Sequence, residues 1–333
     1  MVSRVLLLAA KDTIAYSTRP GRAAVASGAE LLAALPPDLL AAEVVVEDVL
    51  AEPGWDVSSA TMLGLGRRAR AAISDDGYDG VVISYGTDTL AETAFLVDLM
   101  AGPAASRGGI VLTGALRHWD ELSTDGPRNL ASSIAAAADP ALAGAGAVVC
   151  VDDELHAARW VSMVDATTVR AFSSAPDGVL GRVVGTRVEM LGTPPPRPPA
   201  AGGEPESDVA LIKTYPGMNP VLLTAAVDAG ARGVVLEGTG LGNVPVDLFV
   251  AIGDLTDGDI PVVVASRCRT RPVGLSELPA PAGLAAKVGA IGARGLAPEK
   301  ARVALMVALG TDGGVVAARE WFDRLGRPGG GDG

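Results

Sequence analysis

The sequence has few of the residues that build metal centres and disulfide frameworks. Its two cysteines, Cys150 and Cys268, lie far apart beside apolar runs, which favours buried free thiols over a disulfide and fits a reducing cytoplasm. Its two histidines, His118 and His156, show no metal-ligand spacing with cysteine or carboxylates. We therefore expect neither a metal nor another cofactor, and structural or surface roles for both histidines.

Basic residues and long apolar runs are also scarce. There are 27 Lys and Arg against 39 Asp and Glu, a net charge of -12, and no basic stripe suggests a nucleic-acid partner. No run approaches the ~18 apolar residues of a membrane-spanning helix. Residues 2–9 are apolar, but Lys11 and Asp12 follow at once, so a first β-strand fits better than a signal peptide. A cytoplasmic protein is expected.

The chain is long enough for two globular domains. It has 333 residues, against a prior of roughly 150 residues per domain. Short Val/Ile/Leu runs alternate with Ala/Leu-rich stretches of helical period, which is typical of βα units around a parallel sheet. In the first half, the pattern predicts strands at 2–9, 80–84, 110–113 and 147–151, and helices at 58–73, 89–100 and 129–138.

Five prolines within residues 193–199 break this rhythm, and residues 193–206 are expected to be an exposed linker. After it, strands are predicted at 209–214, 233–236 and 261–265, and helices at 221–229, 246–255, 298–308 and 315–325. The expected fold is α/β: a larger, doubly wound, mainly parallel N-terminal sheet domain (1–192) and a smaller C-terminal α/β domain (207–325). The glycine-rich end, 326–333, is predicted to be a flexible tail.

Threonines follow two of the predicted strands. Thr13 comes shortly after the first, and Thr87 and Asp88 follow the strand at 80–84 and precede a helix. Loops at the carboxyl ends of parallel strands gather catalytic groups, and a threonine hydroxyl needs a base or a cation to act as a nucleophile. The alternative is that Asp88 or Thr89 merely caps the following helix.

The motifs Y-G-T-D-T-L-A-E-T-A at 85–94, S-T-D-G-P-R-N-L at 123–130 and D-T-I-A at 12–15 resemble those of the asparaginase/glutaminase family of threonine amidohydrolases. Further segments, such as T-G-A-L-R at 113–117 and G-V-V-L-E-G-T-G-L-G-N-V-P at 233–245, extend the resemblance over nearly the whole chain, the second half being similar to the intracellular branch. The G-T-G-L-G stretch at 238–242 weakly resembles a dinucleotide-binding loop, but the family resemblance implies that it is a turn at the end of a strand.

The resemblance implies specific roles. Thr13 would attack a side-chain amide carbon and form an acyl-enzyme, and Thr87 and Asp88 would form a second triad with a lysine. Gly86 is a candidate substrate-binding residue, and Asp88 would also contact the substrate's α-amino group. Ala115 would line the carboxamide pocket, and Asn243 could reach a neighbouring subunit's site, because family members are homodimers or homotetramers.

Four departures from the family pattern cluster on this site. Ala10-Lys11-Asp12 stands where the family has Thr-Gly-Gly, and Tyr85 replaces a common histidine. Gly54-Trp55-Asp56 occupies the segment that binds the substrate's α-carboxylate, so Trp55 and Asp56 become candidate substrate-binding residues. Met163 replaces the catalytic lysine and supplies only an apolar surface.

Two of these residues have open alternatives. Lys11 is the sole lysine before the proline-rich segment, and its ammonium could replace the lost one; otherwise it is solvated or pairs with Asp12. Trp55 is either a core aromatic or a wall that reshapes the substrate pocket.

Three functions follow from this pattern. The first is an asparaginase-like hydrolase acting on asparagine or a related amide, ester or lactam, with altered specificity. The second is an acyl-transfer or cyclisation enzyme of a specialised pathway, and the third is a non-catalytic binding protein. All three imply a small-molecule ligand.

Overall fold

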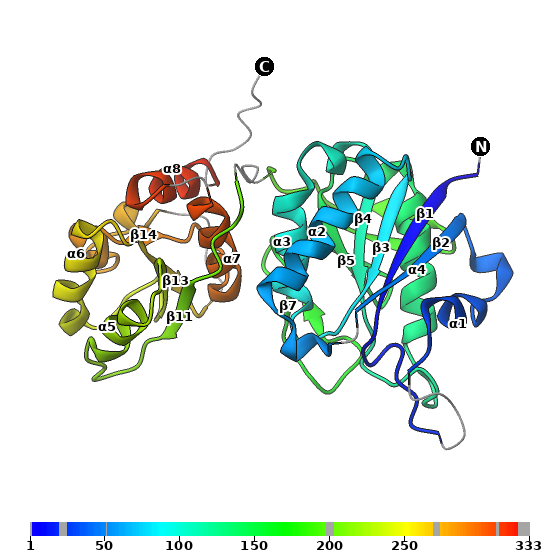
Figure 1. Ribbon diagram of the computed structural model, residues 1–333, viewed down its shortest axis with the longest axis horizontal. Coiled ribbons are helices and arrows are strands. Elements are labelled where there is room, and N and C mark those ends of the chain that lie inside the picture. The colour runs from blue at the N-terminus through cyan, green and yellow to red at the C-terminus, as the bar shows by residue number, and fades with distance from the viewer. Residues whose placement is uncertain are drawn as a thin grey trace. The chain divides into compact units, whose positions relative to one another are not determined.

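A computed structural model describes residues 2–19, 25–50, 52–197, 203–268, 274–310 and 313–325 (Figure 1). The chain forms two compact units, Met1–Pro195 and Pro196–Gly333. Both expected folds are confirmed: a mainly parallel sheet domain with helices on both faces, and a smaller α/β domain. The predicted linker at 193–206 lies partly outside the described residues, and the predicted tail at 326–333 lies wholly outside them.

The N-terminal unit is built on an eight-stranded sheet of order β10-β9-β6-β5-β4-β3-β1-β2. Its first five strands in chain order pair in parallel, and they are β1 (Arg4–Ala10), β2 (Glu43–Leu50), β3 (Gly80–Ser84), β4 (Gly109–Thr113) and β5 (Ala147–Val151). The last three, which pair antiparallel, are β6 (Glu154–Ala157), β9 (Gly181–Val184) and β10 (Arg187–Met190). A separate two-stranded ribbon joins β7 (Ser162–Met163) to β8 (Phe172–Ser173).

Helices cover both faces of this sheet, so its central strands are almost wholly apolar. Leu6 and Leu8 of β1 join a core cluster with α2 (Ser59–Ser74) and α3 (Leu90–Ala101). The alternate residues Val5 and Leu7 join a second cluster with α1 (Gly28–Ala33) and α4 (Gly126–Ala138). Figure 1 shows α2 and α3 together against one face of the sheet.

The strand order reverses at β1. The chain passes from β1 to β2 on one side and then crosses to β3 on the other. In open α/β sheets, ligands bind at the carboxyl ends of the strands beside such a switch point. The register brings these ends level, because Ala9 lies opposite Ser84 and Ser84 lies opposite Thr113. The loops that follow β1, β3 and β4 therefore start side by side.

The C-terminal unit has a four-stranded parallel sheet of order β11-β12-β13-β14. Its strands are β11 (Val209–Lys213), β12 (Gly233–Gly238), β13 (Val262–Ser266) and β14 (Ile291–Gly292), and its helices are α5 (Val221–Asp228), α6 (Phe249–Asp257), α7 (Pro298–Leu309) and α8 (Val315–Leu325). The helix predicted at 246–255 starts as a 3-10 turn, Val246–Leu248, and continues as α6. The glycines after β12 form a tight turn, in which Gly240 and Gly242 have positive φ.

The two cysteines are free, and one expectation about them is wrong. Cys150 is buried on β5, and burial raises its pKa to about 12. Cys268 is exposed, because it follows the end of β13 where the chain leaves the sheet. No helix among the described residues is long and apolar enough to cross a membrane. The described part of the chain likewise contains no cluster of three potential metal ligands.

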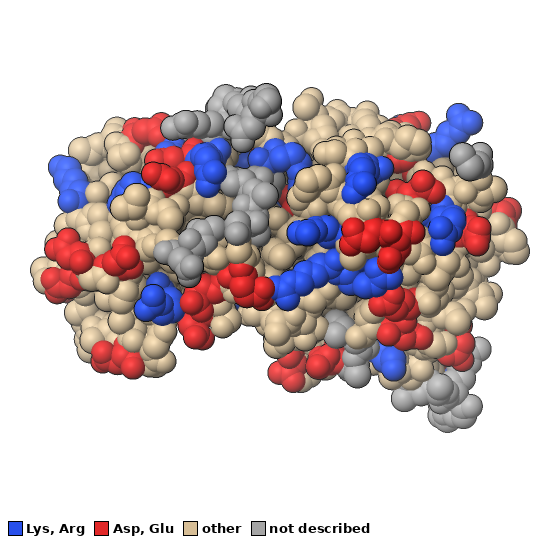
Figure 2. Space-filling view, turned by 45° about the horizontal axis from the view of Figure 1, so that its top comes forward, with Lys and Arg blue, Asp and Glu red and all other residues tan. Residues whose placement is uncertain are grey.

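Acidic and basic side chains alternate on the face shown in Figure 2. Several Lys and Arg side chains adjoin one another there, with Asp and Glu side chains beside them.

Candidate active site

The candidate site lies at the carboxyl ends of β1 and β3, where the loops after β1, β2 and β3 meet. The loop after β2 ends in a 3-10 turn, Gly54–Asp56. Its first residue packs against the loop after β3, because a Cβ added to Gly54 would lie 2.8 Å from the Gly86 Cα. Glycine at both positions allows the two backbones to approach this closely.

A buried carboxylate occupies the point where these loops meet. Asp12 is 6% exposed, and its Oδ2 accepts the Gly54 N–H at 2.6 Å. A Cβ added to Gly86 would lie 2.4 Å from that same oxygen. The Asp12 side chain therefore fills the space left by the two glycines and fastens the loop after β1 to the loop after β2.

Thr13 is bound to the other oxygen of the same carboxylate. Asp12 Oδ1 accepts the Thr13 backbone N–H at 2.6 Å and the Thr13 hydroxyl at 3.1 Å. The Asp12 carbonyl also accepts the N–H groups of Ala15 and Tyr16, at 2.6 and 3.0 Å, which closes a tight turn over these residues. Thr13 is half-buried, with its hydroxyl oriented by a charged acceptor.

Thr87 and Asp88 lie on the loop after β3, adjoining Gly86. Thr87 is 7% exposed, and its Cγ2 would lie 3.1 Å from a Cβ added to Gly114 after β4. Asp88 is exposed. Thr89 stands at the N-cap of α3 but makes no capping hydrogen bond, so the capping interpretation of this motif is wrong. Its hydroxyl instead donates to the Gly54 carbonyl at 2.6 Å, a second tie between these loops.

Tyr85, the residue before Gly86, is buried and contacts Thr89. It is 1% exposed, and its hydroxyl lies 3.3 Å from Thr89 Oγ1. Burial, together with the charges of Glu92 and Asp12, raises the pKa of Tyr85. The phenol therefore stays neutral near neutral pH and can donate a hydrogen bond, but it is a poor candidate for a base.

The loop after β4 is braced by two residues to which the sequence pattern assigned no role. The Asp125 carboxylate accepts the N–H groups of Leu116 and Arg117, both at 3.0 Å. The Asn129 amide donates to the Gly114 carbonyl at 3.0 Å and accepts the Asp152 N–H at 2.9 Å. Residues of the S-T-D-G-P-R-N-L motif thus stabilise the loop after β4. Only the resemblance of this motif to the family indicated that it lies near the site.

Met163 lies in the β7–β8 ribbon and has an apolar side chain. It sits opposite Phe172 in the β7–β8 ribbon and packs, partly buried, on the cluster that contains Ala10 and Tyr85. Across the described residues, no Lys or Arg forms an ion pair with Asp12, Asp56 or Asp88. The described part of the site therefore carries acidic groups without a paired cation.

The structure decides between some of the alternatives for Lys11 and Trp55. Within the described ranges, Lys11 shows no ion pair with Asp12, whose oxygens accept from Thr13 and Gly54. Trp55 is 69% exposed in the turn after β2, so a core role is wrong. Asp56, in the same turn, is also exposed. Both are placed within two residues of the Gly54–Gly86 contact.

The remaining candidates are Ala115, just after β4, and Asn243, in the C-terminal domain. Ala115 is 1% exposed and belongs to the same core cluster as Ile14. Asn243 is in the C-terminal domain, where its side-chain oxygen accepts the Gly283 N–H at 3.2 Å. His156 is buried, with Nδ1 2.9 Å from Ser174 Oγ. None of the contacts of His156 involves Thr13 or Thr87 among the described residues.

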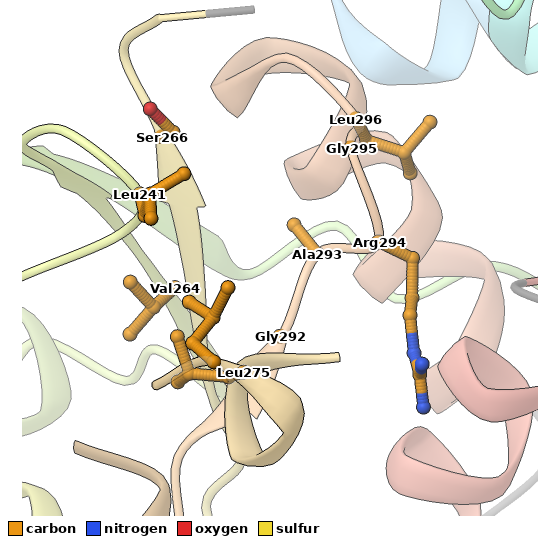
Figure 3. A pocket seen from close by; sticks show the side chains of 10 residues that line it. Leu241, Val264, Ser266, Leu275, Gly292, Ala293, Arg294, Gly295 and Leu296 are labelled. Atoms are coloured by element: carbon orange, nitrogen blue, oxygen red, sulfur yellow. The ribbon is translucent and has the colours of Figure 1, made fainter. Parts of the chain in front are cut away.

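A cavity of about 200 Å³ lies in the C-terminal domain (Figure 3). Aliphatic side chains such as Leu241 and Leu275 line it, and the Arg294 side chain points away from them. The Arg294 guanidinium pairs with Glu277 at 2.7 Å and with Asp323 at 2.5 Å. The Ser266 hydroxyl donates to the Gly240 carbonyl. This lining offers packing surface but no uncommitted catalytic group.

Comparison with known proteins matches both domains. Residues 4–196 match the family model described as asparaginase, N-terminal, and residues 208–322 match the glutaminase/asparaginase C-terminal domain. The chain is 30% identical to an L-asparaginase of Bacillus licheniformis over 80% of this chain and 82% of that protein. It is 37% identical to a probable L-asparaginase of Deinococcus radiodurans over 70% and 71%.

A solved structure agrees with these matches. The crystal structure of a probable cytoplasmic L-asparaginase from Campylobacter jejuni superposes with a TM-score of 0.84 at 28% identity, covering 96% of this chain and 99% of that one.

Proposed function

This chain belongs to the asparaginase family of amidohydrolases, and we propose that it cleaves a linear amide with Thr13 as its nucleophile. The observation that carries this proposal is the Thr13 hydroxyl itself. It lies at the switch point of the sheet and donates to a buried carboxylate at 3.1 Å. A hydroxyl held in this way can attack a carbonyl carbon once its proton is removed.

Thr87 and Asp88 stand on the neighbouring loop and are proposed to act on the bound substrate. Thr87 is buried, at 7% exposed, whereas Asp88 is exposed and can pair with a substrate's amino group. The carboxamide is proposed to sit between Gly86 and the segment at Ala115. These roles follow from family membership and from the adjacency of the loops after β3 and β4.

We also propose that the substrate differs from free asparagine. Where the resemblance places a lysine, this chain has the apolar Met163, and Trp55 presents an exposed aromatic ring in the turn after β2. Together they favour a related amide, ester or lactam that carries an apolar or planar group. The same proposal includes Lys11 as the source of a compensating positive charge, since Lys11 lies on the loop that carries Thr13.

The oligomeric state and the cellular location are also proposals, based on the family resemblance and on the composition of the sequence. We propose a cytoplasmic homodimer or homotetramer, in which Asn243 approaches a neighbouring subunit's site. Residues 193–206 are proposed to link the two domains. Sedimentation velocity of the purified chain measures the assembly directly, and a purely monomeric protein would contradict it.

Ammonia release tests the proposed reaction. The purified chain is incubated with asparagine, glutamine and a panel of β-acyl amides, and ammonia is measured by a coupled assay. Hydrolysis of at least one amide is expected. Hydroxylamine added to the same mixtures should trap the Thr13 acyl-enzyme as a hydroxamate. Failure of every amide in both assays would refute the proposal.

Acyl transfer or cyclisation is the second candidate, favoured by two residues: Met163, which stands where the resemblance places a lysine, and Trp55, which is exposed next to Gly54. These groups could hold an organic acceptor in place of water. Mass spectrometry of the products distinguishes the candidates, because transfer joins the acyl group to an acceptor whereas hydrolysis leaves a free acid.

Met163→Leu is expected to leave the rate of amide hydrolysis close to that of the wild type. The side chain provides packing only, and a swap of similar volume costs less than ~1.5 kcal/mol of stability. Met190→Leu, at another half-buried methionine that packs on the opposite core cluster, is the matched control. A rate loss of roughly tenfold or more at Met163 alone, equivalent to ~1.4 kcal/mol, would show that its sulfur or shape takes part in the reaction.

A further inference from the structure

The geometry around Asp12 points to a catalytic residue, and this inference rests on the function proposed above. We propose that the Asp12 carboxylate is the base that removes the proton from the Thr13 hydroxyl. Its Oδ1 lies 3.1 Å from Thr13 Oγ1, within the ~2.6–3.2 Å reach expected of a general base.

The carboxylate is held for this task by groups that leave it little freedom. Oδ1 also accepts the Thr13 N–H at 2.6 Å, and Oδ2 accepts the Gly54 N–H at 2.6 Å. Gly54 and Gly86 enclose it, and added Cβ atoms would lie 3.3 and 2.4 Å from Oδ2. The oxygen that faces the hydroxyl is therefore fixed before a substrate arrives, as preorganised catalysis requires.

Two other groups that could act as a base, Tyr85 and His156, are held neutral or contact another side chain. Asp12 is the acceptor that the structure gives the Thr13 hydroxyl within the described residues. The buried Tyr85 phenol stays neutral because its pKa is raised. The His156 ring lies against Ser174. A weakly acidic threonine hydroxyl needs a base, and Asp12 is already in contact with it.

The proposed step balances with one amide and one water. As Thr13 Oγ bonds to the amide carbon, its proton passes to Asp12 Oδ1, and the carbonyl electron pair moves onto the carbonyl oxygen. The tetrahedral anion collapses, the C–N bond breaks, and Asp12 returns the proton to the leaving nitrogen, which departs as ammonia. Asp12 then takes a proton from the water that attacks the Thr13 ester. Collapse of the second adduct frees the acid, and the proton returns to Thr13 Oγ.

Asp12→Gly with chemical rescue tests this assignment. The variant leaves an opening the size of a carboxylate, and kcat should fall by roughly 10²–10⁴-fold, the usual contribution of a general base. Formate should restore part of the lost rate. Nitrate is the matched anion, because it is planar, charged and able to accept hydrogen bonds, yet it is not a base at neutral pH. Equal recovery with nitrate would show that Asp12 only positions the loop and would overturn the proposal.

Two controls separate the possible failures. Asp38→Gly, at an exposed carboxylate on a surface turn, should keep full activity and not respond to formate. If Asp12→Gly does not fold, Asp12→Asn retains the side-chain volume and should show the same loss of kcat. If the wild-type protein cleaves amides and the Asp12 variants remain active without a response to formate, the role of Asp12 as the base is refuted, but the proposed hydrolysis is not. Wild-type protein inactive in both assays would refute both.

Discussion

Thr13→Ala is expected to abolish amide hydrolysis, with a fall in kcat of at least ~10³-fold. Removal of a nucleophile from a catalytic group commonly costs several powers of ten, because the remaining residues cannot form the covalent intermediate. The substitution removes one hydrogen bond to Asp12, worth ~0.5–1.5 kcal/mol, and should leave the fold intact. Ammonia release, hydroxamate trapping and thermal unfolding measure the three effects.

Thr13→Ser is the matched control for this variant. Serine keeps the hydroxyl that donates to Asp12 and should retain measurable turnover and hydroxamate formation. A Thr13→Ala protein with near wild-type activity would place the nucleophile elsewhere, with Thr87 as the next candidate. Unchanged ligand binding and unchanged biological role in Thr13→Ala would instead support the non-catalytic binding protein.

Gly86→Ala is expected to lower activity by about 10²-fold, since a misplacement near 1 Å at a reacting group can cost that much. The added Cβ would lie 2.4 Å from Asp12 Oδ2 and 2.8 Å from the Gly54 Cα, so the carboxylate and one loop must move. Overpacking of this kind typically costs ~1–3 kcal/mol of stability. Urea unfolding and steady-state kinetics measure both effects.

Gly64→Ala is the control for the loss of a glycine as such. Gly64 lies in α2 with no atom within 4 Å of an added Cβ, so alanine there should raise stability by ~0.5–1 kcal/mol and leave turnover unchanged. Equal kinetics for Gly86→Ala and Gly64→Ala would mean that the Gly54–Gly86 contact does not shape the site.

The sequence predicted the central parallel strands closely and missed β2, β9 and β10 of the large sheet. β3 and β5 are continuous apolar runs that are buried on both faces, and their observed bounds match those predicted. β2 carries Glu43, Glu47 and Asp48 among its valines, because it is an edge strand with one neighbour. β9 and β10 are short and alternate between exposed and less exposed residues, so their pattern is too weak to separate from loops.

The sequence predicted where the site lies in the fold, but not which side chains contact one another there. Threonines after apolar strands indicated the rim, and the motif resemblance supplied their roles. The hydrogen bond between Asp12 and Gly54 joins residues 42 positions apart, and no local pattern reports such a pairing. The capping alternative at Thr89 fails for the same reason, since the Thr89 hydroxyl donates to the Gly54 carbonyl across the fold. Long-range contacts override local propensity here.

The strand order also bears on how the chain can assemble as it leaves the ribosome. After β1 and β2 pair, each later strand of the large sheet adds to the edge that its predecessor left open, from β3 to β10. Domains of multidomain chains generally fold from the N-terminal end during synthesis. The loops after β1, β2, β3 and β4 all end before α4 begins at Gly126, so they can form long before the C-terminal domain is made.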